Sequence, residues 1–418
     1  MDSPAAPTIV IVDPYSSGGM LAKELKARGA PCVAVEGSPT LPPSMRTQFD
    51  RDDFIDVIST AGDWAETLHR VKRHSPQYVV AGFESGVELA DRLSAELQLP
   101  GNDAAWSTAR RDKFAMTERV RQAGLRTAKQ ICGRDIEAIV RSIDVELDWP
   151  VIVKPPRSVA SDHVTRCEHE EDVRRAAAAI LGRSNVLGLP NDAVLVQEYL
   201  DGVEYAVDIV CRGGQQVVTA IWQYHRPEHH HPESSDHFIC YDSMILLPYE
   251  GVIQEKLASF ATKVLDALGI QFGPAHCELM YVQGEVVFVE VGTRLSASVN
   301  ATLSRTCGGI GQLEKTVQAM LEPERFALEA RRRPSLRRRA ANVFLMPHRP
   351  GRLVQVRGRD ILEALPTLDT MSIASTPGID VGRVAGRVTL ISDDVRAIER
   401  DIAVIRGLQE RGIFEVED

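Results

Sequence analysis

The stretch "HCELMYVQGEVVFVEV", residues 276–291, sets Glu278 and Glu290 among apolar residues, with a third glutamate, Glu285, next to the central Gln283-Gly284. The apolar and β-branched residues on either side of Gln283-Gly284 predict a β-hairpin. A carboxylate in such a strand is costly unless a cation or a metal ion partners it. Glu278 and Glu290 are therefore the first candidates for a functional site.

The length of the turn decides which way the two glutamates point. A two-residue turn at Gln283-Gly284 places them on opposite faces, where each is an ordinary exposed residue of a half-solvated hairpin. A three-residue loop, Gln283 to Glu285, sets Glu278 directly opposite Glu290, since cross-strand partners share a face. Two carboxylates on one face suit a hard cation such as Mg²⁺. Both arrangements are compatible with the sequence.

Earlier in the chain, two lysines and two more glutamates stand at the ends of predicted elements. Lys154 follows the apolar strand in "PVIVKPP", and Lys113 lies in the first turn of the helix "DKFAMTERV". A lysine there is either a solvated end of the element or a point charge for phosphate. Glu198 and Glu204 flank the hairpin turn "YLDG". For each of the four, a surface position is the ordinary alternative.

The first hundred residues alternate between short apolar runs and helical patterns. "TIVIVD", "PCVAVEG" and "QYVVAGF" are predicted strands, and "MLAKELKARGA" and "WAETLHRVKRH" have helical spacing. This alternation predicts a Rossmann-like lobe, a parallel sheet covered by helices. "PYSSGGM" is not G-x-G-x-x-G, so we identify no dinucleotide fingerprint. Hairpins at "DG" and "QG" then indicate antiparallel strands, so the fold class is α/β, with α+β parts.

Composition and charge exclude several classes of function. The 418 residues carry a net charge of −10, which disfavours a nucleic-acid partner because such binding needs a basic surface. No apolar run approaches the length of about 20 residues that a membrane span needs. The seven cysteines are scattered without a C-x-x-C pair, so we expect a cytoplasmic protein without disulfides. The basic run "RRRPSLRRR" is interpreted as a solvated linker rather than a phosphate-binding tail.

The order of these motifs resembles that of the ATP-grasp superfamily. "PVIVKP", "LVQEYLDGVEYAVD", "CELM" and "VEVGTRLSAS", together with Lys113, carry the resemblance over about residues 100–300. "VDPYSSGGMLA", "GFESGVELADRLSAELQLPGN", "ARRDKFAM" and "SVASD" are similar to the bacterial L-amino-acid (dipeptide) ligases. The resemblance implies an ATP-grasp fold, with a Rossmann-like N-terminal lobe and with central and C-terminal α+β lobes that clasp ATP. The implied domains are 1–105 (N-terminal lobe), 106–200 (central subdomain), 201–330 (catalytic core with the metal site) and 331–418 (C-terminal subdomain).

The resemblance also implies roles and a reaction. The nucleotide would be bound by Lys113, Lys154 and Ser161 at the phosphates, by Glu198, Tyr199 and Leu200 at the adenine, and by Glu204 at the ribose. Glu278 and Glu290 would hold Mg²⁺, as one or two ions, with Mn²⁺ as a substitute. A substrate carboxylate would attack the γ-phosphate of ATP, and an amine would then attack the resulting acyl phosphate to give an amide. Lys154 and Arg294 would neutralise the transferred phosphate, since such catalysis is mainly positioning and charge neutralisation.

The implied enzyme is an ADP-forming carboxylate–amine ligase that acts on an amino acid or a related small acid and on an amine. The resemblance also implies that the protein is a homodimer. Two more residues join Arg294 as candidate substrate contacts. Glu84, in the "GFESGV" turn after a predicted strand, would bind the amino group of an amino acid or would cap a helix. His276 shares a strand face with Glu278 and is either a substrate contact or a packed core histidine.

Two positions depart from the superfamily pattern. The loop "RSVASDHV", residues 157–164, has no glycine, and Ala160 and His163 stand where glycine is expected. This change reduces backbone freedom near the phosphates. Gly292 replaces the usual metal-binding asparagine, which leaves the number of Mg²⁺ ions open. The alternatives are therefore another ATP-grasp enzyme, such as a carboxylase or a purine-pathway-like ligase, and a nucleotide-binding protein with a degenerate site.

Five histidines gather in "YHRPEHHHPESSDHF", residues 224–238. Zinc ligands usually stand on ordered elements, whereas the prolines, serines and charges here favour a mobile loop between strands. The stretch is interpreted as a lid over the substrate or as an inert solvated loop.

Overall fold

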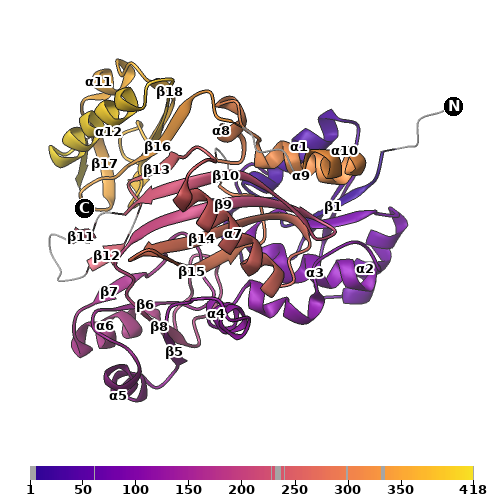
Figure 1. The fold of residues 1–418 in the computed structure, drawn as a ribbon, viewed down its shortest axis with the longest axis horizontal. Coiled ribbons are helices and arrows are strands. Elements are labelled where there is room, and N and C mark those ends of the chain that lie inside the picture. The colour runs from indigo at the N-terminus through magenta and orange to yellow at the C-terminus, as the bar shows by residue number, and fades with distance from the viewer. Residues whose placement is uncertain are drawn as a thin grey trace.

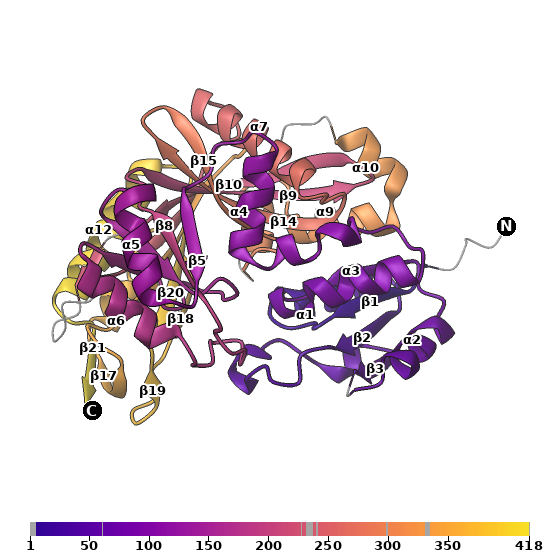
Figure 2. The same ribbon diagram turned by 90° about the horizontal axis from the view of Figure 1, so that it is seen from below.

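The computed structural model describes residues 6–417, except 61, 227, 231–236, 240, 298–299 and 331–334. The N-terminal lobe is a parallel sheet in the order β3-β2-β1-β4, with helices packed against it (Figures 1 and 2). Its elements are β1 (Ile9–Val12), α1 (Ser17–Ala27), β2 (Cys32–Glu36), β3 (Asp56–Ser59), α2 (Trp64–Arg73), β4 (Tyr78–Ala81) and α3 (Val87–Glu96). The central strand β1 is wholly buried, as expected for a parallel strand covered on both faces.

The central segment is an antiparallel sheet with two helices on one face. Its elements are α4 (Lys113–Gln122), β5 (Gln130–Gly133), α5 (Ile136–Glu146), β6 (Val151–Lys154), β7 (Thr165–Cys167), α6 (Glu170–Ile180) and β8 (Val194–Glu198). Val151 and Val153 of β6 pack against α5 and α6, whereas Ile152 and Lys154 point to the other face and line a cavity. This alternation follows from the two-residue period of a strand.

The largest sheet has eight strands in the order β15-β14-β9-β10-β13-β16-β20-β18. They are β9 (Val203–Arg212), β10 (Gln215–His225), β13 (Ser243–Leu246), β14 (Phe272–Val282), β15 (Glu285–Gly292), β16 (Arg339–Leu345), β18 (Leu368–Ile373) and β20 (Gly386–Ser392). Helix α7 (Val252–Ala267) and α4 cover one face with the main apolar core, and the opposite face of β9 and β14 carries polar residues. Strands β16, β18 and β20, from the C-terminal part of the chain, continue this eight-stranded sheet. The C-terminal part also contains two helices, α11 (Arg359–Glu363) and α12 (Val395–Glu410), and a small sheet of β17 (Gly351–Val356), β19 (Asp380–Val381) and β21 (Phe414–Glu417).

The hairpin of β14 and β15 combines features of both predicted turns. Val282 pairs with Glu285, so the turn has two residues, and Gln283 and Gly284 both have positive φ, 49° and 95°. Nevertheless Glu278 pairs directly with Glu290, because the register shifts by one residue before the next pair, Leu279 with Phe288. The extra residue is a β-bulge in β15. The expectation that a two-residue turn separates the glutamates onto opposite faces is therefore wrong, and the expected three-residue loop is not formed.

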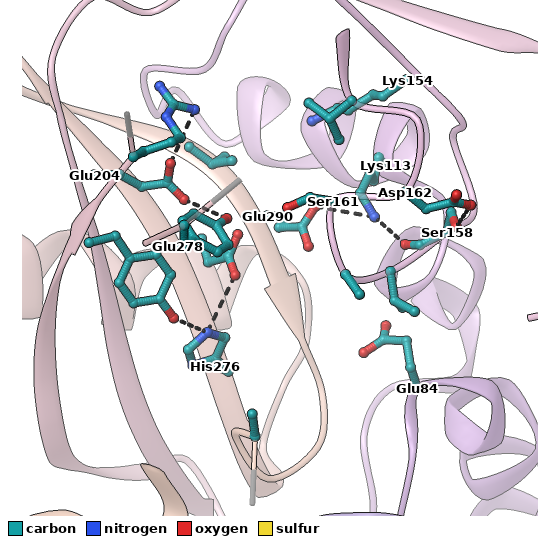
Figure 3. Close-up of a pocket in the computed structure, with 18 of the residues that line it drawn as sticks. Glu84, Lys113, Lys154, Ser158, Ser161, Asp162, Glu204, His276, Glu278 and Glu290 are labelled. Carbon is teal, nitrogen blue, oxygen red and sulfur yellow. Dashed lines mark hydrogen bonds and ion pairs between the residues drawn. The ribbon is translucent and has the colours of Figure 1, made fainter. Parts of the chain in front are cut away.

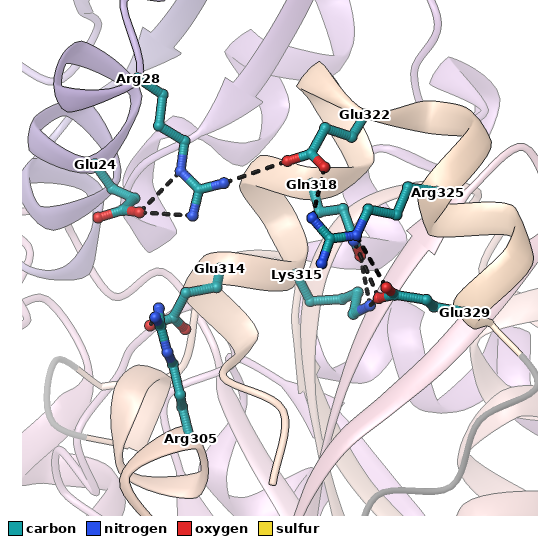
Figure 4. Close-up of polar contacts among 9 residues, drawn as sticks. All are labelled: Glu24, Arg28, Arg305, Glu314, Lys315, Gln318, Glu322, Arg325 and Glu329. Carbon is teal, nitrogen blue, oxygen red and sulfur yellow. Dashed lines mark hydrogen bonds and ion pairs between the residues drawn. The ribbon is translucent and has the colours of Figure 1, made fainter. Parts of the chain in front are cut away.

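The N-terminal lobe shares an apolar core with helices that follow β15. Helix α9 (Gln312–Leu321) lies against α1, and Leu313, Val317 and Met320 join the cluster that contains Leu21 and Leu25. Polar contacts continue this interface toward α10 (Pro323–Glu329), where Arg28, directly after α1, approaches Glu322 (Figure 4). Helix α8 (Asn300–Thr306) precedes this pair of helices. Within the described ranges, none of the helices combines the length and apolar character of a membrane span.

Candidate active site

A cavity of about 430 Å³ lies where the three segments meet, and it receives the residues predicted for the site. The N-terminal lobe contributes the turn after β4, the central segment contributes β6, β8 and the loop after β6, and the large sheet contributes its polar face (Figure 3). All of the predicted site residues line it: Glu84, Lys113, Lys154, Ser161, Glu198, Tyr199, Leu200, Glu204, His276, Glu278, Glu290 and Arg294. Residues that are far apart in the sequence therefore face one volume.

Two lysines and a glutamate form the charged centre of the cavity. Lys113 stands at the start of α4, where Asp112 caps the helix by accepting a hydrogen bond from the Ala115 amide. The Lys113 ammonium lies 3.1 Å from Glu290 Oε2 and donates to the Ser158 carbonyl at 2.7 Å. Lys154, at the end of β6, is buried, and burial lowers its pKa to about 8 against the opposing attraction of Glu290. Cations held in this way suit a polyphosphate.

The two hairpin glutamates face the cavity side by side. Burial raises the pKa of Glu290, but Lys113 and Lys154 outweigh it and hold that pKa below its usual range. Among the described residues, no three histidine, cysteine or acidic side chains form a metal-binding group. Two carboxylates nevertheless fit Mg²⁺, which usually takes one or two protein carboxylates and completes its shell with water and substrate phosphates.

Arg294 is held in place by the glutamate predicted to contact substrate. Its Nε lies 3.1 Å from Glu84 Oε2, and Arg111 donates to Glu84 Oε1 at 2.7 Å. Burial raises the pKa of Glu84, but Arg111 and Arg294 outweigh it and hold that pKa below its usual range. A Cβ at Gly292 would lie 3.0 Å from the guanidinium carbon of Arg294. The missing asparagine side chain thus leaves space that the guanidinium uses.

The glycine-free loop adopts the backbone conformation that glycine favours. Ala160, Ser161 and His163 have φ values of 58°, 54° and 51°. Asp162 holds the loop by accepting hydrogen bonds from the Ser158 hydroxyl at 2.6 Å and from the Val186 amide at 3.3 Å. The loop therefore keeps its shape without glycine, at the cost of backbone strain.

The nucleotide end of the cavity contains two further glutamates, both already paired. The Glu198 carboxylate accepts from Arg126 at 2.8 Å and from the Lys129 amide at 3.0 Å, so its side chain is turned toward these donors. Glu204 lies 3.1 Å from Arg226, and the Tyr241 hydroxyl donates to it at 2.9 Å. Burial raises the pKa of Glu204.

Comparison with known proteins agrees with this geometry. Residues 147–302 match the family model described as "ATP-grasp domain". Residues 147–302 therefore form an ATP-grasp domain. The ATP-grasp fold expected from the sequence is confirmed, with its parallel N-terminal sheet and antiparallel sheets elsewhere.

One curated protein and two solved structures are similar to this chain over nearly its whole length. It is 28% identical to dapdiamide A synthase from Enterobacter agglomerans over 416 residues, which is 96% of this chain and 95% of the relative. The L-amino acid ligase from Bacillus licheniformis has the same fold, with a TM-score of 0.75, 17% identity and full coverage of both chains. N5-carboxyaminoimidazole ribonucleotide synthetase from Thermotoga maritima follows with a TM-score of 0.65, 18% identity and coverage of 99% and 100%. The expected class of enzyme is therefore confirmed: an ATP-dependent, ADP-forming ligase that makes an amide bond.

Several polar residues in or beside this cavity were not singled out from the sequence. Asp208 of β9 is fully buried and lies 2.6 Å from His276 Nδ1. Burial lowers the pKa of His276, but Asp208 outweighs burial and raises it to about 9. The signal for Asp208 was present, since it is a carboxylate inside the apolar run "VEYAVDIVC". Arg111 and Arg226 carried no comparable signal because arginines in loops are ordinary surface residues.

Part of the histidine-rich stretch is strand rather than loop. Strands β11 (Glu228–His230) and β12 (His237–Ile239) pair with each other, and β12 pairs with β7, directly after the 157–164 loop. The prediction of a loop between strands is therefore wrong for residues 228–230 and 237, because backbone pairing with the edge strand β7 organises them. The intervening residues 231–236 lie outside the described residues, so the lid interpretation stays a prediction.

Proposed function

We propose that this ligase joins a small carboxylic acid or an amino acid to an amine, such as that of a second amino acid, and converts ATP to ADP and phosphate. The observation that carries the proposal is the meeting of Lys113, Lys154, Glu278, Glu290 and Arg294 around one cavity. An amino acid as one substrate is supported by the shared fold with an L-amino acid ligase.

The proposed reaction has two steps at one place. A carboxylate oxygen of the acid attacks the γ-phosphorus of ATP, and ADP leaves. The nitrogen of the amine then attacks the acyl carbon, and phosphate leaves as the amide forms. Lys113 and Lys154 hold the triphosphate, and Arg294, fixed by Glu84, meets the negative charge on the transferred phosphoryl group.

Glu278 and Glu290 are proposed to bind Mg²⁺, for which Mn²⁺ can substitute. When bound, the ion would neutralise phosphate charge and fix the orientation of the triphosphate. The adenine is proposed to lie along Glu198, Tyr199 and Leu200 with the ribose at Glu204, and Ser161 is proposed to face the phosphates. Glu84 and His276 remain proposed substrate contacts.

A matrix of acids and amines, read by ADP and phosphate release, tests this function. We expect turnover only when both substrates are present, and we expect hydroxylamine to trap the acyl phosphate as a hydroxamate. Replacement of Lys154 or Glu290 with alanine should abolish turnover in a folded protein. Glu285→Ala, at an exposed position of the same hairpin, is the matched control and should keep full activity. Release of AMP and pyrophosphate would contradict the mechanism.

The same assay separates the proposal from a carboxylase of the same fold. Bicarbonate-dependent release of phosphate without any amine would favour the carboxylase. The proposed domain limits, the homodimer and the cytoplasmic location remain predictions. Sedimentation of the purified chain measures the oligomeric state directly.

A further inference from the structure

One face of the large sheet carries polar residues in two neighbouring rows that cross β9, β14 and β15. Asp208 of β9 pairs in register with His276 of β14, and His276 pairs with Gly292 of β15. In the next row, Ala206 pairs with Glu278, which pairs with Glu290. Since cross-strand partners share a face, the row of Asp208 and His276 runs directly beside the row of the two glutamates.

A chain of contacts connects these rows. The Trp222 indole donates to Asp208 Oδ2 at 2.8 Å, and Asp208 Oδ1 lies 2.6 Å from His276 Nδ1. On its other side, His276 Nε2 lies 3.0 Å from the Tyr224 hydroxyl and 3.4 Å from Glu278 Oε1. Figure 3 shows His276 below Glu278, with both side chains facing the cavity.

The small residue Ala206 lies next to this chain of contacts. Trp222 pairs with Ala206, so its indole stands one row away from the Asp208 carboxylate that it reaches. Ala206 is fully buried on the same face, so a larger side chain there would have to displace its neighbours. Asp208 and Trp222 are themselves fully buried, so both ends of the contact are fixed by packing.

We infer that Asp208 and Trp222 are positioning residues that hold His276 against Glu278 and thereby fix the carboxylate that receives the divalent cation. The inference rests on the proposed metal role of Glu278. The imidazole ring has one rotational setting in which Nδ1 meets Asp208, and that setting places Nε2 beside Glu278. Partners of this kind typically change metal affinity by about 10–100-fold when they are lost.

A packed polar core without any effect on the metal is the competing explanation. In that case loss of Asp208 lowers stability and leaves cation binding unchanged. A role of His276 as a substrate contact alone, without an effect on Glu278, is the second competing explanation. It predicts a higher KM for the acid with unchanged cation affinity.

The test measures Mn²⁺ binding to the full chain with a non-hydrolysable ATP analogue, by titration calorimetry and by the spectrum of bound Mn²⁺, so that no turnover is needed. We expect Asp208→Asn to weaken Mn²⁺ binding about tenfold or more. We expect Trp222→Phe, which removes the indole N–H donor and keeps an aromatic ring, to weaken binding by a smaller factor. Asp401→Asn is the matched control, because Asp401 is a buried carboxylate in the C-terminal helix α12 that accepts from Thr367. It should leave Mn²⁺ affinity unchanged.

The variant Glu278→Gln separates the inference from the function on which it rests. Loss of Mn²⁺ binding in Glu278→Gln together with wild-type binding in Asp208→Asn overturns the inference alone. Wild-type binding in Glu278→Gln removes the metal role of Glu278, and the inference falls with it. If Asp208→Asn does not fold, Trp222→Phe decides, and unchanged Mn²⁺ affinity in that variant overturns the inference.

Discussion

At the scale of single residues, the space at Gly292 matters as much as the charges around it. A Cβ there would lie 3.0 Å from two atoms of the Arg294 guanidinium and 3.1 Å from Glu84 Oε2. We expect Gly292→Ala to displace Arg294 and to lower kcat about tenfold or more, since small shifts of a positioned group cost large factors in rate. ADP release and a thermal melt measure activity and folding together.

The control for this substitution is Gly382→Ala, where a Cβ would meet nothing within 4 Å. It should leave both activity and melting temperature unchanged. Full activity in Gly292→Ala would show that the guanidinium of Arg294 does not depend on this space.

Ala160 tests the strain in the loop over the phosphates. Its φ of 58° costs about 1–2 kcal/mol in an L-residue and little in glycine. Glycine also increases the conformational entropy of the unfolded chain. The net stabilisation of the folded loop by Ala160→Gly is therefore about 1 kcal/mol or less. We expect a severalfold tighter binding of ATP, measured by calorimetry, if the loop orders when the nucleotide binds. Weaker binding would indicate that the alanine is needed for contacts rather than tolerated.

The pKa of Lys154 predicts an alkaline limit on activity. With a pKa of about 8 in the folded protein, Lys154 loses its charge as pH rises through this value, so kcat/KM for ATP should fall above pH 8. The pKa lies below the unfolded value of 10.5, so the unfolded chain binds more protons between these two values. The unfavourable contribution of Lys154 to stability is thus present below pH 8 and fades as pH rises toward 10.5.

A rate profile across this pH range measures the prediction. Lys154→Arg keeps a permanent charge, so the residual activity of this variant should lose the alkaline decline. Lys129→Arg, at a solvent-exposed lysine, should show the unchanged wild-type profile. The same decline in Lys154→Arg would assign the titration to another group.

Residue-level reasoning on the sequence found the buried charges but not their partners. The cost of a carboxylate in an apolar strand singled out Glu278 and Glu290, which do face one another. Asp208 carries the same signal, yet its partner His276 is 68 residues away, and strand register over that distance depends on the whole sheet. The pairing of Glu84 with two arginines was equally hidden, because it joins separate segments of the chain.

At the scale of elements, the contacts between α9 and α10 form a stabilising cluster with a clear pH dependence. Lys315 is 4% exposed and lies 3.0 Å from Glu329, which Gln318 also contacts (Figure 4). Hydrogen bonds from Gln318 and Lys315 lower the pKa of Glu329 to about 2. The folded pKa is depressed, so this stabilisation is present above the unfolded value of 4.5 and is lost as pH falls through about 2.

We expect Glu329→Gln to lower the free energy of unfolding by about 1–3 kcal/mol at neutral pH, because it leaves the buried Lys315 ammonium without its charged partner. The difference from wild type should shrink between pH 4.5 and pH 2. Denaturant unfolding at several pH values measures both effects. Glu324→Gln, on the exposed part of α10, is the control and should change little. A difference that stays constant down to pH 2 would contradict the assignment.

The strands and helices themselves were largely predictable, whereas their irregularities were not. Alternation of apolar and polar residues predicts β9, β10 and β14, since one face of each packs on α7. The bulge in β15 leaves no local signal, because it depends on pairing with both β14 and the segment at Thr127. Strands β11 and β12 were missed for the same reason, as they form by pairing with an edge that local sequence does not reveal.

At the scale of the whole molecule, the order of the motifs predicts the fold, but the way the segments join is visible only in the structure. The predicted limit at residues 330 and 331 falls between strands of one continuous sheet, where β16 pairs with β13. An apolar cluster also joins α1 to α9, although the predicted domain limit at residue 105 separates these two helices. Such contacts depend on the surface of folded elements, so composition and periodicity cannot specify them.

The shared core of α1 and α9 sets a rule for building hybrids of this enzyme with its relatives. An exchange of residues 1–105 alone would bring a foreign α1 against Leu313, Val317 and Met320, whose shapes are matched to Leu21 and Leu25. The transplanted lobe also carries Glu84 and its hold on Arg294. A functional hybrid would therefore have to exchange α9 together with the lobe, although more than 200 residues separate them along the chain.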